Sequence, residues 1–562
     1  MGDRLAGIGV SPGFAAGPVY QVAPPPALPP PVPVTDPAAE SARALSALAE
    51  VAAELTRRAA AASHPAAADI LRAQAMMADD PVLKEAVAEA VRAGTDAPHA
   101  IEAALATQRA AFEAAGGYLA ERAADLDDLR DRAVARCLGQ PMPGVPEPGH
   151  PFILVAHDLA PADTAGLDTT RVLALVTESG GPTSHSAIVA RTLGLPAVVR
   201  CPGILAVPDA TVVAVDGATG EVELSPDPAT VAGAALRERQ RRDKLARSSG
   251  PGRTSDGHPV ALLANVGSAE DLATPAAAAA EGVGLFRSEL LYLGRATPPT
   301  LDEQIATYTG VFTRAAGRRV VVRTLDAGAD KPLPFLRQPE EPNPALGVRG
   351  LRLSLRHPDV LHTQVRAIAE AARATGAEVW VMAPMVATAA EAAEFVAACR
   401  AAGLPKAGVM VEVPAAALRA RDLAGVVDFL SLGTNDLSQY AFAADRQCGE
   451  LAHLLDPWQP ALLELIAACA EAGQAAGVPV GVCGEAAADP ALAVVLTGLG
   501  VTSLSMAAPA IPAVREALAA HTLAQCQEAG RAARAAADAD AARAAVRAAV
   551  RAAVRPETAP TG

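Results

Sequence analysis

The sequence predicts a multi-domain α/β protein, in which a small α/β domain carries an inserted helical bundle and precedes a (β/α)8 barrel of the TIM type. Residues 37–139 are rich in Ala, Glu, Arg and Leu at helical spacing, and short β-type runs flank them on both sides. Beyond residue 252, eight strand-like runs alternate with Ala-rich helical intervals. The 562 residues are 51% hydrophobic but only 3% aromatic, so several cores built from Ala, Val and Leu are expected.

The small α/β domain is expected to be split in sequence. A strand-like piece over residues 5–22 leads into a proline-rich connector at 24–37, where missing N–H donors exclude a helix or a central strand. β-type runs resume at 152–156, 172–176, 197–199 and 211–215. We therefore predict the α/β domain over residues 1–22 and 143–228, with a helical insert of about four helices over 23–142.

A charged linker helix is expected over residues 229–252, ending at Gly250-Pro251-Gly252. The eight strand-like runs of the barrel, predicted over residues 253–530, are 260–267, 282–289, 320–326, 379–385, 408–414, 428–436, 478–485 and 503–507. The uncharged stretch 491–514 is broken by glycines and prolines, which favours a buried helix, turn and strand over a membrane span. Residues 531–562 form a low-complexity Ala/Arg tail, expected to be a solvated helix without a sizeable apolar face.

Composition excludes several classes of protein. A net charge of −15 and few aromatic residues argue against nucleic-acid binding, which needs a basic surface and stacking platforms. Seven scattered cysteines without a CxxC pair argue against a disulfide scaffold or a thiolate zinc site and predict a cytoplasmic protein. The N-terminus lacks the apolar region of a signal peptide.

Polar residues recur where the predicted barrel strands end. Active sites of such barrels lie at the carboxyl ends of the strands, so these side chains are expected to share one site. Guanidinium groups match phosphate and carboxylate, and Mg²⁺ takes one or two carboxylates and leaves room for substrate, so we predict an anion site for a small phosphorylated acid beside a Mg²⁺ site. The residues are Arg287, Arg323, Glu412, Asn435, Asp436, Cys483 and Glu485, with Arg349 and Arg446 in the loops after the third and sixth strands.

His185 belongs to a second predicted site. It follows Gly180-Gly181-Pro182-Thr183-Ser184 and precedes a helical run, so it is expected near a helix N-terminus, where backbone N–H groups favour an anion. Imidazole titrates near neutral pH and is a competent nucleophile toward phosphorus. This pattern indicates a phosphoryl acceptor, whereas the other histidines stand in ordinary helical or loop sequence.

Together these stretches resemble the enzyme I family of the bacterial phosphoenolpyruvate-dependent sugar phosphotransferase system. The resemblance extends from residue 5 to about residue 530 and depends on an ordered set of motifs. They include GGPTSHSAIVARTLGLPAVV from Gly180, EGVGLFRSELLYL from Glu281, VVRTLDAGADKPLP from Val321, NPALGVRGLR from Asn343, GVMVEVPAAA from Gly408, SLGTNDLSQYAFAADR from Ser431 and GVCGEAAADP from Gly481.

The resemblance implies a function and a role for each site residue. The family transfers the phosphoryl group of phosphoenolpyruvate to its own histidine and then to the phosphocarrier protein HPr, releasing pyruvate, and it acts as a homodimer through its barrel. The implied roles are phosphorylated histidine for His185, support of that histidine for Thr164, Mg²⁺ binding for Glu412 and Asp436, substrate binding for Arg287, Arg323, Asn435, Asp436, Arg446 and Arg349, and proton donation for Cys483. The helical insert would dock HPr.

Two residues depart from the family pattern. Pro182 stands where many members have Arg, and Gln74 stands where some have His, so a phosphate contact and the HPr-docking surface are expected to differ. Competing hypotheses are a pyruvate,phosphate dikinase or phosphoenolpyruvate synthase, for which the insert is too short, and a lyase with the same barrel, which leaves His185 unexplained. A regulatory or scaffold module would require a broken site, and a nitrogen-type branch would carry a sensory domain before residue 5.

Overall fold

The computed structural model describes residues 4–23, 26–61, 65–115, 123–140, 142–146, 148–159, 167–181, 184–293, 295–328, 333–336, 341–446 and 449–554. The chain divides into two compact units, Met1–Arg239 and Gln240–Gly562. The division falls within helix α9, Pro228–Arg247, which occupies the predicted linker. The predicted domain boundaries themselves stay a prediction.

The first unit contains an eight-stranded mixed sheet of order β1-β8-β7-β3-β4-β5-β6-β2. Its strand β4 is buried along its whole length, and alternate residues join different apolar clusters: Phe152 and Leu154 one, Ile153 and Val155 the other. The sheet therefore has apolar packing on both faces. The strands are β1 Arg4–Ala6, β2 Ile8–Ser11, β3 Phe14–Gln21, β4 Phe152–Ala156, β5 Val172–Thr177, β6 Ala197–Val199, β7 Val212–Asp216 and β8 Glu221–Leu224.

Five helices of the described residues form the helical insert, which shares a separate core of Ala, Leu and Val. They are α1 Pro37–Ala61, α2 Pro65–Ala78, α3 Pro81–Arg92, α4 Ala97–Ala115 and α6 Ala123–Cys137. Gln74 of α2 is 1% exposed, and its Nε2 donates to Asp125 Oδ1 of α6 at 3.3 Å. Gln74 therefore lies inside the bundle with Leu71 and Ala75 and is not part of an exposed docking surface, and its effect on docking stays a prediction.

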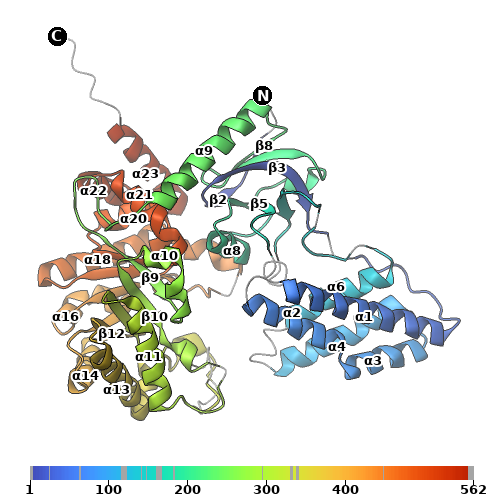
Figure 1. The fold of residues 1–562 in the computed structure, drawn as a ribbon, viewed down its shortest axis with the longest axis horizontal. Helices are drawn as coiled ribbons and strands as arrows, with labels where there is room; N and C mark the ends of the chain where they lie inside the picture. Colours follow the sequence, from blue (N-terminus) through green and yellow to red (C-terminus); the bar gives the residue numbers. More distant parts are fainter. Residues whose placement is uncertain are drawn as a thin grey trace, which may run out of the picture. The chain divides into compact units, whose positions relative to one another are not determined.

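The second unit contains a closed barrel of eight parallel strands, as predicted (Figure 1). Adjacent strands pair from β9 round to β16, and β16 closes the barrel on β9 with Ser503 opposite Ala261. The strands are β9 Ala261–Val266, β10 Gly282–Arg287, β11 Arg319–Arg323, β12 Val379–Ala383, β13 Ala407–Val411, β14 Leu430–Gly433, β15 Val480–Cys483 and β16 Ser503–Met506.

Helices cover the outside of the barrel strands (Figure 1). Several begin with a capping box. At the start of α11, for example, the Thr300 hydroxyl accepts from the Glu303 backbone N–H, and the Glu303 carboxylate accepts from the Thr300 backbone N–H. The helices are α10 Pro275–Ala278, α11 Leu301–Ala315, α12 Leu351–Arg356, α13 Pro358–Thr375, α14 Ala389–Ala401, α15 Pro414–Leu418, α16 Ala420–Ala424, α17 Thr434–Phe442, α18 Pro460–Ala476, α19 Glu485–Ala488, α20 Pro490–Gly498, α21 Ile511–Ala519, α22 Leu523–Arg534 and α23 Ala539–Val554.

Two expectations about the barrel unit are wrong in detail. The runs 282–289 and 428–436 extend past their strands, because Glu289 lies in a 3₁₀ turn and Asn435 in α17. The Ala/Arg repeat is not a solvated tail: Ala542 and Val546 of α23 are buried in the barrel's apolar cluster. Because α23 has alanine on every face, the sequence shows no distinct apolar face that would predict this burial.

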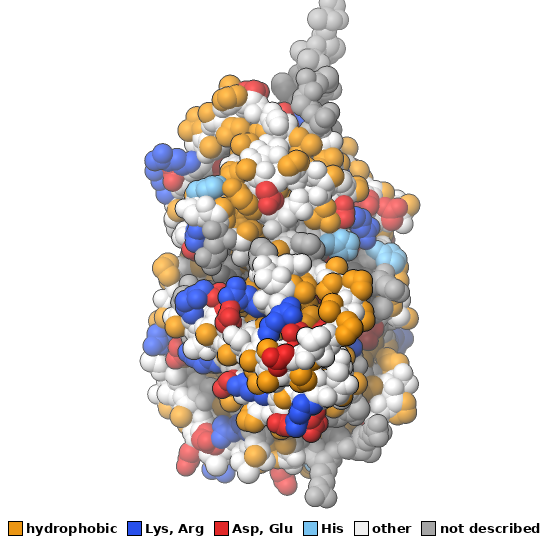
Figure 2. All heavy atoms as spheres, turned by 90° about the vertical axis from the view of Figure 1, so that its right-hand side faces the viewer, with side chains coloured by type: hydrophobic (Ala, Val, Ile, Leu, Met, Phe, Trp, Pro, Cys, Tyr) orange, Lys and Arg blue, Asp and Glu red, His pale blue; other side chains and the backbone are white. Residues whose placement is uncertain are grey.

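The surface agrees with the composition. Basic and acidic side chains are interspersed on the face shown in Figure 2, so that face carries no broad basic field of the kind nucleic acid requires. In the described part of the chain, every helix is too short or too polar to cross a membrane.

Candidate active site

The predicted substrate-binding side chains lie where barrel strands end or in the loops that follow. Arg287 and Arg323 are the last residues of β10 and β11, and Glu412 directly follows β13. Asp436 is in the first turn of α17, directly after β14. The barrel therefore brings residues that are far apart in the sequence to one end, as expected for this fold.

Arg323 is held between two carboxylates at this end. Its Nη2 contacts Glu289 Oε1 at 2.5 Å and its Nη1 contacts Asp326 Oδ2 at 3.1 Å, and all three side chains are less than 10% exposed. Burial lowers the pKa of Arg323, but Asp326, Glu289 and Glu412 outweigh it and raise the pKa, so the guanidinium stays charged. Its buried Nε has no hydrogen-bond partner in the described residues, which leaves one donor for an anion.

The ion pairs continue from Asp326 across the barrel mouth. Asp326 Oδ1 lies 3.5 Å from Nη2 of the buried Arg349, and Arg349 Nη1 lies 3.2 Å from Asp436 Oδ1. Asp436 Oδ2 lies 3.4 Å from Nη1 of the exposed Arg446. Acidic and basic groups therefore alternate from Glu289 to Arg446. These ion pairs hold the guanidinium groups in place.

Glu412 is a buried carboxyl group of this site with a raised pKa. Burial, together with the carboxylates of Asp436 and Asp326, raises the pKa of Glu412 to about 8, although Arg323 and the Met385 N–H act in the opposite direction. Met385 N donates to Glu412 Oε2 at 2.9 Å. A Cβ built on Gly433 would lie 2.6 Å from Glu412 Cγ, so a glycine at 433 is needed to seat this side chain.

Glu412 and Asp436 fit a hard divalent cation. Both are buried, and the carboxylate of Asp436 raises the cost of charge on Glu412, which a cation relieves. The described residues contain no group of three or more His, Cys, Asp or Glu placed to hold a metal ion. Such a cation would therefore need further oxygen ligands from water or substrate, as Mg²⁺ commonly does.

Cys483, the last residue of β15, is 3% exposed inside the barrel. Its Sγ lies 3.2 Å from Ser431 Oγ and 3.5 Å from Leu432 O. Burial raises the pKa of the Cys483 thiol to about 11, with a smaller contribution from Glu412. The thiol is therefore protonated at neutral pH, the form that can donate a proton.

Arg287 and Asn435 lie at the same strand ends but outside the ion-pair series. Both are exposed, and neither side chain makes a hydrogen bond or ion pair within the described part of the chain. Gly484 lies beside Asn435, because a Cβ built on Gly484 would be in van der Waals contact with Asn435 Oδ1 at 3.4 Å. The alternating ion pairs of the barrel mouth include the predicted residues Arg323, Arg349, Asp436 and Arg446. Arg287 and Asn435 take no part in them.

His185 is the first residue of α8, His185–Leu193, in the first unit. Ser184 caps the helix by accepting from Ala187 N at 3.3 Å, and Gly180 supplies the positive φ of +90° that the preceding turn needs. Ser186 Oγ donates to Asp158 Oδ1 at 2.6 Å, which ties α8 to the end of β4. Thr164 and Pro182 lie outside the described residues.

The sequence analysis missed Glu289, Asp326 and Tyr440 as members of the site. Glu289 and Asp326 position Arg323, and the Tyr440 hydroxyl lies 3.3 Å from Arg349 Nη1. The sequence could have indicated both carboxylates, because Glu289 and Asp326 each follow within three residues of an arginine that ends a strand. Nothing local distinguishes Tyr440, because its contact comes from tertiary folding.

Comparisons with known proteins identify the family. Residues 241–523 match the PEP-binding domain of PEP-utilising enzymes, residues 6–122 the N-terminal domain and residues 148–220 the mobile domain. A phosphoenolpyruvate-protein phosphotransferase of Streptomyces coelicolor is 56% identical over 549 residues, covering 97% of this chain and 98% of that protein. The chain belongs to the phosphoenolpyruvate-protein phosphotransferase family.

Two further proteins are also similar to this chain. A phosphoenolpyruvate-protein phosphotransferase of Geobacillus stearothermophilus is 38% identical over 538 residues and covers 92% of each chain. The solved structure described as the NMR solution structure of Enzyme I (nEIt) is 29% identical, covering 42% of this chain and 99% of that chain with a TM-score of 0.39. Family membership confirms the predicted enzyme class and sets aside the dikinase, lyase and non-enzymatic hypotheses.

Proposed function

We propose that this enzyme transfers the phosphoryl group of phosphoenolpyruvate to His185 and then to the phosphocarrier protein HPr, releasing pyruvate. The alternation of buried arginines and carboxylates at the barrel mouth carries this proposal, because it suits a small, multiply charged phosphorylated acid. Family membership supports the reaction class.

The proposed binding step uses the arginines of the barrel mouth. Arg323 and Arg349 would bind the substrate from the buried side, while Arg287, Arg446 and Asn435 would close over it from the exposed side. Glu289, Asp326 and Asp436 fix the guanidinium planes, so less side-chain entropy is lost when the anion binds. Glu412 and Asp436 would hold Mg²⁺, which when bound would stabilise negative charge on the substrate oxygens.

The proposed transfer breaks the bond between phosphorus and the enol oxygen and forms a bond from phosphorus to an imidazole nitrogen of His185. His185 and the barrel arginines belong to different units, so the two units must meet during this step. The start of α8 offers backbone N–H donors to the incoming phosphoryl group, and Thr164 would support the histidine.

The enolate left behind needs a proton on its methylene carbon to become pyruvate. Cys483 would donate the thiol proton that burial retains, and its thiolate would be reprotonated from solvent. The neighbouring Ser431 hydroxyl can stabilise that transient thiolate by donating a hydrogen bond.

Docking of HPr on the helical insert, dimerisation through the barrel and a cytoplasmic location follow from the resemblance and stay predictions. The proposed function is tested by measuring pyruvate release from phosphoenolpyruvate with Mg²⁺ and no nucleotide. We expect turnover that requires HPr and stops after a single equivalent without it. Turnover that requires AMP and inorganic phosphate instead of HPr would contradict the proposal.

A further inference from the structure

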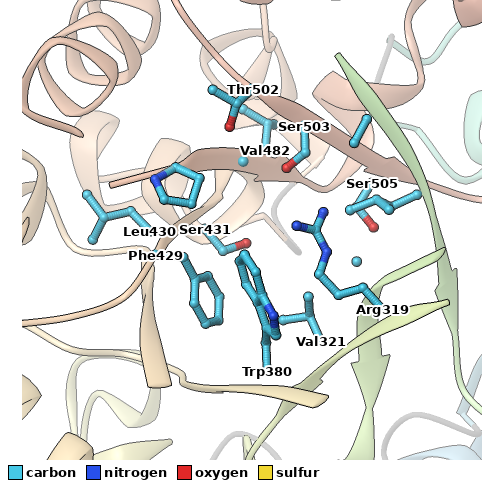
Figure 3. A pocket seen from close by; sticks show the side chains of 15 residues that line it. Arg319, Val321, Trp380, Phe429, Leu430, Ser431, Val482, Thr502, Ser503 and Ser505 are labelled. Carbon is cyan, nitrogen blue, oxygen red and sulfur yellow. The ribbon is translucent and has the colours of Figure 1, made fainter. Parts of the chain in front are cut away.

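A cavity lies in the barrel, at the amino ends of the strands. It has a volume of about 200 Å³, and Figure 3 shows the side chains around it. Arg319, the first residue of β11, contributes the single charged side chain among its lining residues. Trp380 and Phe429 supply aromatic surface, and Ser431, Ser503 and Ser505 supply hydroxyl groups.

This cavity lies at the opposite end of the barrel strands from the ion-paired arginines of the candidate active site. Arg319 and Arg323 are the first and last residues of the same strand, so they lie about 13 Å apart along β11. The interior between them is filled by an apolar cluster that includes Val321, Met382 and Met410. A ligand bound at Arg319 would therefore not reach the ion-paired arginines of the phosphoenolpyruvate site, although Ser431 both lines the cavity and contacts Cys483.

Arg319 lies over one wall of the cavity. Its Cζ is 4.4 Å from the centre of the Trp380 ring, and Trp380 packs against Phe429 with ring centres 4.9 Å apart. In Figure 3 the guanidinium extends past the Trp380 ring toward the serine side chains of β16. The aromatic stack thus fixes the cation beside hydroxyl groups.

The guanidinium of Arg319 retains its capacity to bind an anion. Its Nε is buried without a hydrogen-bond partner, and it forms no ion pair within the described part of the chain. The two carboxylates that act on it electrostatically have other partners: Glu378 accepts from Trp380 Nε1 at 3.0 Å, and Glu281 accepts from the backbone N–H groups of Gly252 and Leu262, both at 2.8 Å. A buried donor without a partner is costly, and an anionic ligand would satisfy it.

We propose that this cavity is a binding site for a small organic carboxylate with an apolar, preferably aromatic, body. The carboxylate would bind the Arg319 guanidinium and the Ser503 hydroxyl, because the Ser431 and Ser505 hydroxyls already contact Cys483 Sγ and Asn265 Oδ1. The apolar body would pack on Trp380 and Phe429. An apolar protein cavity of about 150 Å³ holds benzene, so the volume here suits a ligand the size of benzoate. Inorganic phosphate or sulfate would leave the aromatic wall without a partner.

The probe for the test is benzoate, with benzyl alcohol as a neutral analogue of similar size. Calorimetric titration of the full-length wild-type enzyme is expected to show saturable binding of benzoate, with a dissociation constant on the order of 1 mM. Benzyl alcohol is expected to bind at least about tenfold more weakly because it cannot pair with a guanidinium. Equal affinity for the two compounds, or no saturable binding of benzoate, would overturn the proposal.

Arg319→Gln locates the binding, and Arg314→Gln on the exposed face of α11 is the matched control. Arg319→Gln is expected to weaken benzoate binding about tenfold or more and to leave the KM for phosphoenolpyruvate unchanged, whereas Arg314→Gln changes neither. Unchanged benzoate affinity in a folded Arg319→Gln variant would place the ligand elsewhere. If Arg319→Gln does not fold, the comparison of benzoate with benzyl alcohol on the wild-type enzyme decides.

Discussion

Removal of helix α23 is predicted to destabilise the barrel unit, although its Ala/Arg repeat resembles a dispensable tail. Val546 and Ala542 are 4% and 0% exposed, and Arg543 makes two contacts of 2.8 Å to the carboxylate of the buried Asp456. Arg543 also lies 5.5 Å from the centre of the Trp458 ring. Termination after Asp538 would expose these apolar side chains and leave Asp456 without its main cationic partner.

The expected size of the effect follows from these contacts. Burial of Val546, Ala542 and Ala539 contributes about 3–4 kcal/mol, and leaving a buried carboxylate without its cation costs about 1–3 kcal/mol. Part of this is offset because the deleted helix no longer has to be ordered. A net loss of about 2–4 kcal/mol would lower the melting temperature by roughly 5–10 °C.

Tryptophan fluorescence is the assay for this prediction. The chain has two tryptophans, Trp380 and Trp458, and both belong to the barrel unit, so thermal unfolding followed at this signal reports on that unit. Termination after Val554 is the control and should leave the transition in place. Arg543→Gln should lower the melting temperature and Arg547→Gln, at an exposed position on the same helix, should not. An unchanged transition after termination at Asp538 would refute the packing of α23.

Three further predictions concern the barrel mouth. Cys483→Ala should still permit phosphorylation but release pyruvate at least about tenfold more slowly and without stereochemical control, as measured in deuterated water. Protonation by Cys483 in the wild type should itself not vary from pH 6 to 9, because the thiol pKa of about 11 keeps the thiol protonated. Arg323→Lys should raise the KM for phosphoenolpyruvate about tenfold or more, measured by steady-state kinetics, since lysine cannot contact Glu289 and Asp326 together. Glu412→Gln should abolish turnover yet stabilise the metal-free protein increasingly as pH rises from 5 to 8, measured by denaturant unfolding. The sign follows because the folded pKa of about 8 exceeds the ordinary glutamate pKa of 4.5, so the stability of the wild type falls as pH rises between these two values.

The barrel was predictable because its strands are short apolar runs at regular intervals, and the closed register of β9 to β16 confirms all eight. Strand ends were less predictable. The polar residues after a strand continue its apparent pattern until a 3₁₀ turn or a helix begins, as at Glu289 and Asn435.

The candidate site was predictable to the extent that strand-terminal position determines proximity. Arg323, Glu412 and Asp436 follow this rule, whereas the pairing of Arg349 with Asp326 and Asp436 depends on how the loop before α12 folds. The burial of Gln74 was missed for a related reason: its surroundings come from the packing of α2 against α6, which no local pattern specifies.

The central claim is that phosphoenolpyruvate phosphorylates His185 directly, and mass spectrometry of the intact protein tests it most directly. Incubation with phosphoenolpyruvate and Mg²⁺, without nucleotide or HPr, should add one phosphoryl group per chain, which fragmentation places on His185. The modification should disappear in acid, persist in base and be absent from His185→Ala, with His357→Ala, a histidine at the start of α13, behaving as wild type. A phosphoryl group that survives acid, or that forms equally in His185→Ala, would contradict the account.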